Sequence, residues 1–93
     1  MIPFGMSAAA PPTVSVHVVL FASYADSLGV DALELTLPAP TTISAIVEHL
    51  RTLPGGSRLP PKPMCALNLA HAQPHDPVAE GDEVAILPPL AGG

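Results

Sequence analysis

The chain has 93 residues, of which 48% are hydrophobic and 12% charged, and a formal net charge of −5 at pH 7. This length accommodates one domain, and the apolar content excludes an intrinsically disordered chain. The three basic residues are Arg51, Arg58 and Lys62, and so acidic a surface argues against nucleic acid and anionic membranes as partners. No apolar run approaches the roughly 20 residues of a membrane-spanning helix.

Residues 1–13 precede the first patterned segment and are interpreted as a flexible N-terminal leader. They lack the basic start of a secretory signal peptide, and Pro11 and Pro12 lie near their end. The single cysteine, Cys65, excludes an internal disulfide. We therefore expect a cytoplasmic protein in which residues 14–93 form the domain.

Alternating apolar residues predict the first strand over residues 14–22. One side of this segment carries Val14, Val16, Val18 and Leu20, and such β-branched residues favour strands. The other side is also apolar beyond Ser15 and His17, which predicts a central strand covered on both faces.

A polar loop over residues 23–31, with a turn at Gly29, is expected to lead into a second strand over residues 32–37. This strand places Leu33, Leu35 and Leu37 inward, and Pro38 ends it. The first two strands are therefore predicted to form a hairpin.

The one predicted helix runs from Ile43 to about Leu53. Thr41 and Thr42 offer a hydroxyl that can cap its first turn. Its apolar stripe, at the spacing of one helix face, consists of Ile43, Ile46, Val47 and Leu50. Pro54, Gly55 and Gly56 break the helix.

The rest of the chain predicts a proline-rich connector over residues 57–63, a strand over residues 64–70 and a last strand over residues 84–87. A turn at residues 80–83 leads into the last strand, and a short strand near residues 71–73 remains an option. This order predicts an α+β fold of the β-grasp (ubiquitin-like) type, with a four- to five-stranded mixed sheet packed on one main helix.

Internal side chains offer little chemistry. His71 and His75 are four residues apart, but Pro74 prevents the helix that would align them, so solvated loop histidines are favoured over metal ligands. Cys65 lies in an apolar run without a flanking base, which favours a buried, unreactive thiol over a catalytic one. We expect no metal site, no permanently bound cofactor and no internal active site.

The C-terminus combines a stiff stem with a slender tip. Leu87 is expected to close the last strand, and Pro88 and Pro89 extend the chain because each fixes φ near about −65°. Leu90 offers an apolar anchor, and Ala91 is small.

Gly92 and Gly93 then have no Cβ, so another protein's walls can close on their backbone. Residues 88–93 reach about 20 Å at ~3.3 Å per residue, enough to enter a partner's active site. A frayed, functionless end is the alternative.

Three segments together carry a resemblance to a known family: residues 18–22, residues 81–85, and Pro88-Pro89 followed by Gly92-Gly93. In combination they resemble the small subunit of molybdopterin synthase, a member of the MoaD/ThiS family of ubiquitin-like sulfur carriers. Asn68, after the third strand, supports the match. The resemblance covers residues 14–93.

This resemblance implies a two-stage mechanism centred on Gly93, with Gly92 beside it. An ATP-using activating enzyme (MoeB-like) would adenylate the Gly93 carboxylate, and a persulfide would convert it to a thiocarboxylate. The tail would then enter the large catalytic subunit (MoaE-like) and give its sulfur to cyclic pyranopterin monophosphate, forming the molybdopterin dithiolene. The expected partner-binding residues are Leu87, Pro88, Pro89, Leu90 and Ala91.

The resemblance also implies a heterotetramer of two small and two large subunits, in which this chain is a non-catalytic sulfur donor. Its acidic charge suits a basic partner surface. Other functions remain open: a sulfur carrier for thiamine thiazole or cysteine biosynthesis, a ubiquitin-like protein modifier, or a binding module without covalent chemistry.

Overall fold

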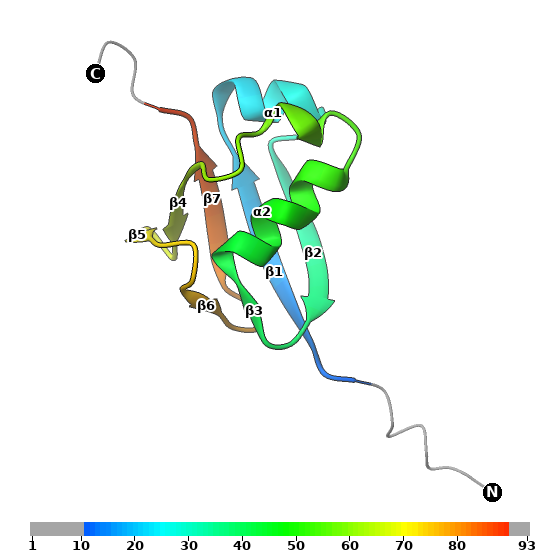
Figure 1. Cartoon of the computed structure of the whole chain (residues 1–93), viewed down its shortest axis with the longest axis vertical. Coiled ribbons are helices and arrows are strands. Elements are labelled where there is room, and N and C mark those ends of the chain that lie inside the picture. Colours follow the sequence, from blue (N-terminus) through cyan, green and yellow to red (C-terminus); the bar gives the residue numbers. More distant parts are fainter. Residues whose placement is uncertain (1–10, 90–93) are drawn as a thin grey trace, which may run out of the picture.

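A computed structural model describes residues 11–89, and residues 1–10 and 90–93 lie outside the described part. Five strands form one mixed sheet in the order β2-β1-β7-β4-β5 (Figure 1). Their bounds are β1 (Thr13–Leu20), β2 (Ala32–Pro38), β4 (Met64–Leu67), β5 (Ala70–Ala72) and β7 (Glu83–Leu87). The first strand thus begins one residue earlier, and the last strand one residue earlier, than the sequence predicted.

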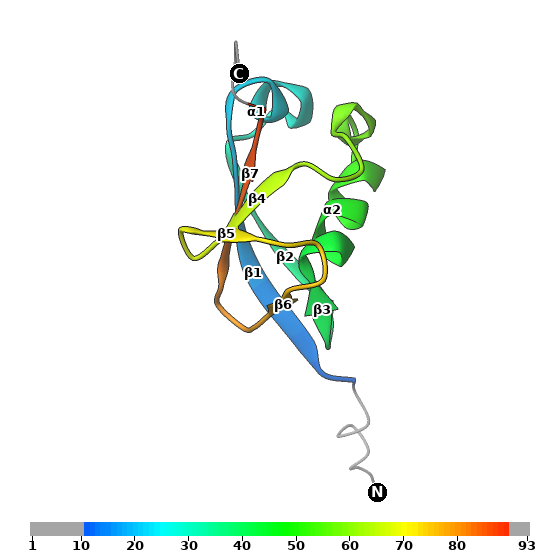
Figure 2. The ribbon, with the colours of Figure 1, turned by 60° about the vertical axis from the view of Figure 1, so that its left-hand side comes forward.

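Two of these strands, β1 and β7, pair in parallel at the middle of the sheet. β1 also pairs antiparallel with β2, as the predicted hairpin requires, and β7 pairs antiparallel with β4. The helix α2 (Ile43–Thr52) lies across one face of this sheet (Figure 2). A helix packed on a mixed sheet in this order is the predicted β-grasp fold.

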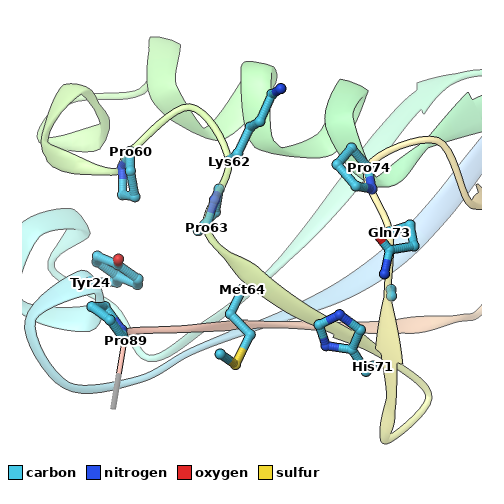
Figure 3. A pocket seen from close by; sticks show the side chains of 10 residues that line it. Tyr24, Pro60, Lys62, Pro63, Met64, His71, Gln73, Pro74 and Pro89 are labelled. Carbon is cyan, nitrogen blue, oxygen red and sulfur yellow. The ribbon is translucent and has the colours of Figure 1, made fainter. Parts of the chain in front are cut away.

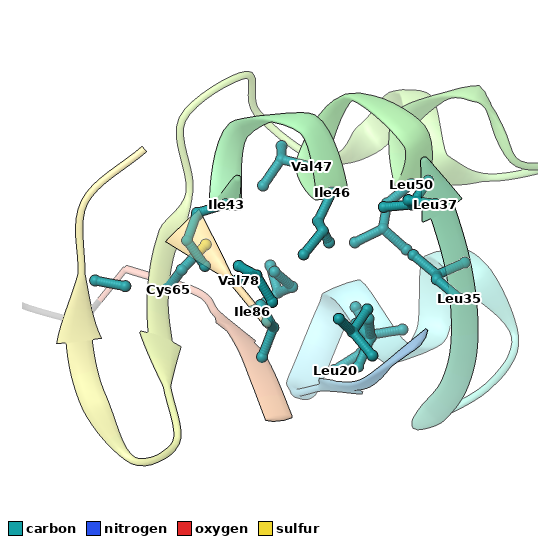
Figure 4. Close-up of a cluster of buried hydrophobic side chains, with 14 of the residues drawn as sticks. Leu20, Leu35, Leu37, Ile43, Ile46, Val47, Leu50, Cys65, Val78 and Ile86 are labelled. Carbon is teal, nitrogen blue, oxygen red and sulfur yellow. The ribbon is translucent and has the colours of Figure 1, made fainter. Parts of the chain in front are cut away.

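The core fills the space between α2 and the sheet (Figure 4). The helix contributes its predicted apolar stripe, and the sheet contributes alternate residues of its strands. The buried sheet residues include Val14, Val16, Val18, Leu20, Leu35, Leu37, Cys65, Val84 and Ile86. Each large aliphatic side chain removed from water in this way stabilises the fold by roughly 1.5–3 kcal/mol.

The start of α2 follows the predicted capping pattern. Thr42 has an extended backbone, and its Oγ1 accepts a hydrogen bond from the Ala45 amide at 3.3 Å. This bond satisfies one of the N–H groups that have no partner within the helix. The helix ends at Thr52, one residue before the predicted end.

The predicted loop over residues 23–31 is wrong, because a second helix, α1 (Ala22–Leu28), occupies most of it. Gly29 ends α1 with φ +77°, and its amide donates to the Ala25 carbonyl at 2.8 Å. Seven residues with one buried side chain, Tyr24, are too few for an apolar helical period to emerge from the sequence.

The glycine pair after α2 permits two close backbone contacts. A Cβ at Gly55 would lie 1.9 Å from the Ser27 carbonyl oxygen, and one at Gly56 would lie 1.9 Å from the Leu50 carbonyl oxygen. Only glycine allows such approaches. The pair therefore brings the end of α2, the 3-10 helix η2 (Gly56–Arg58) and α1 together.

The prediction that β1 is covered on both faces is also wrong. Ser15, His17 and Val19 are only half-buried, and α2 lies on the other face of the sheet (Figure 2). Within residues 11–89, no helix covers this second face. We call it the open face.

The predicted strand over residues 64–70 is shorter, and a turn follows it. β4 and β5 form a hairpin whose two turn residues, Asn68 and Leu69, have φ of +50° and +73°. β5 corresponds to the optional strand near residues 71–73. Two further strands were not predicted: β3 (Thr41–Thr42) and β6 (Pro77–Val78), which pair with each other.

Candidate functional site

The stem of the C-terminal tail begins at the centre of the sheet. Ile86 is fully buried and pairs with Leu20, while Leu87 pairs with Met64 of β4 and is half-buried. Pro88, half-buried, and Pro89, exposed, follow. The strand before the tail is thus held on both sides and cannot shift without breaking two hydrogen-bonded ladders.

The remaining predicted site residues, Leu90, Ala91, Gly92 and Gly93, lie outside the described residues. For Gly92 and Gly93 the structure describes only the strand that precedes the tail. That strand ends beside α1 (Figure 1).

An apolar cluster occupies the open face beside the base of the tail. Its members alternate with buried residues along β1, β4 and β7, and are Val19, Met64, Ala66, Ala85 and Leu87. Strand register places them next to one another through the pairs Met64–Leu87, Ala66–Ala85 and Val19–Ala85. Met64 is 41% exposed, and Phe21, the extended residue that follows β1 and borders the cluster, is 45% exposed. We call these five residues the open-face cluster.

The opposite end of the open face is charged. His17 pairs in register with Glu34 of β2 on one side and Glu83 of β7 on the other. The His17 imidazole Nδ1 bonds to the Glu34 carboxylate, and Glu80 accepts a hydrogen bond from the Ser15 amide at 2.8 Å. The open face is therefore apolar near the tail and acidic away from it.

A shallow groove of about 430 Å³ lies beside the tail's base, along the edge of the sheet formed by β4 and β5 (Figure 3). At one end of it lie Tyr24 of α1, Pro60 and Pro89; Pro63 and Met64 lie in the middle, and His71, Gln73 and Pro74 lie at the other end. Met64 belongs both to this groove and to the open-face cluster. The apolar end of the groove thus joins the open-face cluster at the base of the tail, and continuous apolar surface of this kind is typical of a protein-docking surface.

Asn68 and Asp82 fix the turn that leads into β7. Asn68 Nδ2 donates to Asp82 Oδ1 at 3.0 Å, and Asn68 Oδ1 accepts from the Glu83 amide at 2.9 Å. The backbone amide of Ala79 also donates to Asp82 Oδ2, at 2.8 Å. This bond, and after it the bond from the Asn68 side chain, lower the pKa of Asp82 because both favour the ionised carboxylate. Asp82 therefore has a structural role.

Cys65 is a buried, free thiol, as the sequence predicted, and is 2% exposed. Burial raises the pKa of this thiol to about 11, because a thiolate loses its hydration in an apolar environment. The reactive, ionised form is therefore scarce at neutral pH, and Cys65 is unsuited to nucleophilic catalysis.

The two histidines considered as metal ligands lie in different settings. His71 is an exposed residue of β5, the short strand that the sequence left open as the alternative to a loop. His75 is exposed in the following turn, 3.9 Å from the Asp76 carboxylate. Within residues 11–89, no three His, Cys, Asp or Glu side chains gather in a metal-binding arrangement, and no helix is long and apolar enough to cross a membrane.

The order of strands and the helix define a ubiquitin-like β-grasp protein, and the sequence places it more narrowly. Residues 18–93 match the model of the ThiS family. The chain therefore belongs to the ThiS family, which groups it with the ubiquitin-like sulfur carriers.

Solved structures of similar fold come from archaea and bacteria. SAMP1 from Haloferax volcanii has a TM-score of 0.71 at 23% identity, covering 85% of this chain and 99% of that chain. A putative molybdopterin converting factor subunit 1 from Pyrococcus furiosus has a TM-score of 0.72 at 21% identity, covering 83% and 99%.

A complex of subunits 1 and 2 of the molybdopterin-converting factor from Helicobacter pylori also matches, with a TM-score of 0.62 at 20% identity, covering 86% and 100%. The comparison with curated proteins gave no match. Identities this low show the fold that these proteins share.

Proposed function

We propose that this chain is the sulfur-carrier small subunit of a molybdopterin synthase, and that the Gly93 carboxylate is its reactive group. The carboxylate attacks the α-phosphorus of ATP on an activating enzyme, releasing pyrophosphate and forming a glycyl adenylate. The terminal sulfur of a persulfide then displaces AMP. A thiol cleaves the resulting acyl disulfide, which leaves a thiocarboxylate on Gly93 and a disulfide on the donor.

In the second stage, the tail delivers this sulfur to cyclic pyranopterin monophosphate on the large subunit. Two deliveries supply the two sulfur atoms of the dithiolene, and water restores the Gly93 carboxylate each time. Delivery on a tether raises the effective concentration of the sulfur nucleophile at the acceptor. ATP is consumed by the activating enzyme, and this chain needs no cofactor of its own.

The observation that carries the proposal is the position of β7. A central strand, paired on both sides, ends at Leu87, six residues before Gly93, and apolar surface lies beside that point. This arrangement suits a carrier that docks by its body and inserts its tail. The tail residues Pro88, Pro89, Leu90 and Ala91 would lie inside the partner's entry channel and contact its walls.

Family membership and the solved relatives support the choice of partner. The Helicobacter pylori relative is bound to subunit 2 of the molybdopterin-converting factor, and we propose a corresponding large subunit here, in a heterotetramer. The formal charge of −5 favours a basic docking surface on that subunit.

Deleting Gly93 tests the proposal. The chain then ends one residue, about 3.3 Å, short of its normal reach, so we expect sulfur transfer to be lost. The unfolding midpoint should not change, because the sheet ends before the deletion. The assay is intact-mass analysis after incubation with ATP, the activating enzyme and a persulfide donor.

The matched control is Gly93→Ala, which keeps the length and the terminal carboxylate but adds a methyl group. We expect it to be loaded more slowly than wild type but not to be inactive. Full sulfur transfer by the chain without Gly93 would overturn the terminal mechanism.

A protein modifier is the second candidate, because SAMP1, which is also described as a small archaeal modifier protein, has a closely similar fold. The same mass analysis separates the two. An oxygen-to-sulfur replacement at the terminus supports a carrier, whereas attachment of the chain to a lysine supports a modifier. Growth rescue of strains lacking one pathway then distinguishes the molybdopterin carrier from thiamine or cysteine carriers.

A further inference from the structure

Leu69, at the tip of the β4–β5 hairpin, has an unusual conformation for its residue type. Its φ is +73°, and that of the preceding Asn68 is +50°. A two-residue hairpin turn with both φ values positive favours asparagine followed by glycine. Leucine in this region suffers a steric clash between its Cβ and the backbone.

The side chain of this strained residue adds no buried apolar surface that would stabilise the fold. Leu69 is 89% exposed, so its apolar side chain is not removed from water. Glycine would relieve the backbone and expose less apolar surface. A residue that is unfavourable on both counts in the free protein points to a role outside it.

The turn is also held rigidly. The Asn68 amide donates to the Glu83 carbonyl at 2.8 Å, in addition to the two side-chain bonds that join Asn68 to Asp82 and to the Glu83 amide. The hairpin tip projects on the side of the sheet away from α2 (Figure 2). The backbone of the turn that carries Leu69 is therefore held in place, and little backbone entropy is lost when a partner binds this residue.

We propose that Leu69 is an anchor residue that inserts into an apolar socket, bordered by arginine or lysine, on the protein that receives the C-terminal tail. This inference rests on the proposed function and adds a second contact to it. Three acidic residues near the turn, Glu80, Asp82 and Glu83, supply the charge that a basic border would meet.

The position of the hairpin relative to the tail explains why one partner would use both. The tip lies beside the start of β7, and the tail departs from the other end of that strand. Five residues of β7 span about 16 Å at ~3.3 Å per residue. The open-face cluster lies between the two points, so a single partner that covers it touches both. Two separated contacts fix the direction in which the tail enters.

The test compares Leu69→Gly and Leu69→Ala with wild type, using the purified large subunit of molybdopterin synthase from the same genome as the probe. For Leu69→Gly we expect a thermal midpoint about 4 °C higher, because strain is relieved, and an affinity about tenfold lower. Leu69→Ala should lose the same affinity without the gain in stability. Val30→Ala, which truncates another exposed residue (45%), is the control and should bind like wild type.

The outcomes separate this inference from the function on which it rests. If wild type binds and Leu69→Gly binds equally well, the anchor is wrong and the proposed function stands. If wild type does not bind at all, the proposed function is wrong, and so is the inference that Leu69 is an anchor residue. If wild type forms a dimer in sedimentation experiments that Leu69→Gly abolishes, Leu69 serves self-association and the proposal is overturned.

Discussion

The two faces of the sheet are built from the same strands but meet different surroundings. Along β1, the residues toward α2 are all buried, whereas Ser15, His17 and Val19 on the open face are half-buried. The open face nevertheless keeps an apolar half, around Met64 and Leu87, and an acidic half, around Glu34 and Glu83. One packed face is enough to hold the fold, so the apolar half of the other face indicates a surface for a partner.

Breaking the covered face should have the largest effect. Leu50 of α2 is fully buried in the core, and Leu50→Ala removes its packing and leaves a cavity. We expect a loss of about 2–5 kcal/mol in the free energy of unfolding, measured by urea denaturation. For a 93-residue domain this is a large share of the total stability, so a loss below 1 kcal/mol would contradict the described core.

Changing the open face should instead weaken binding while stability is retained. Met64→Glu puts a charge into the open-face cluster, and desolvating that charge against a partner's apolar surface is unfavourable. We expect at least a tenfold loss of affinity for the large subunit, about 1.4 kcal/mol, measured by calorimetry. The free energy of unfolding of Met64→Glu should stay within about 0.5 kcal/mol of the wild-type value.

Val30→Glu is the matched control for that change. Val30 is 45% exposed, follows α1 and lies outside the open-face cluster, so it receives the same charge without facing the proposed partner. Equal losses of affinity in the two variants would show that net charge, rather than the cluster, governs binding.

The smallest expected effect concerns the acidic end of the open face and depends on pH. The pKa of Asp82 is lowered from its ordinary value of 3.8, chiefly by the Ala79 amide and then by Asn68. A carboxyl group whose pKa is lower in the folded state stabilises the fold above its unfolded pKa, and this contribution is lost as the pH falls through the folded value. Asp82→Ala should cost about 1 kcal/mol at pH 7.

Denaturation of wild type and Asp82→Ala at a series of pH values checks this expectation. The difference between them should be constant above pH ~5 and shrink below ~3.8. Asp26→Ala, which removes an exposed carboxylate of α1, is the control and should track wild type. The assigned hydrogen bonds would be contradicted if the difference in free energy of unfolding between wild type and Asp82→Ala grew as the pH falls.

Several features could be predicted from the sequence because a local pattern determined them. The stripe Ile43, Ile46, Val47 and Leu50 and the cap at Thr42 define α2 by themselves. The strands β1, β2 and β7 follow from alternation, and the order of elements then allows few topologies. The Gly-Gly end was predicted to enter a partner's active site from its stiff stem and its lack of side chains, and the reactivity of Gly93, which the family resemblance implies, stays a prediction.

Other features depend on contacts between distant segments. α1 has one buried residue, Tyr24, and lies against η2 through the close approach at Gly55, which no local pattern reveals. The turn at Asn68 and Leu69 was missed because leucine does not signal a turn. The two-residue strands β3 and β6 exist only as partners of each other.

The open face shows how one pattern can mislead. Val19 and Phe21 are apolar, and burial under a second layer was inferred from them. In the structure they lie on or beside uncovered surface near the tail. The sequence predicts one amphipathic helix, which can cover one face of the sheet. Apolar residues on the second side of a strand are therefore also compatible with a docking surface.

The central place of β7 bears on what happens when a partner grips the tail. A force applied at Leu87 along the direction of β7 loads the ladders of this strand with β1 and β4 together, in shear. An edge strand pulled sideways would instead peel away one hydrogen bond at a time. Under the proposed function, the body of the domain would therefore stay folded each time a partner binds and releases the tail.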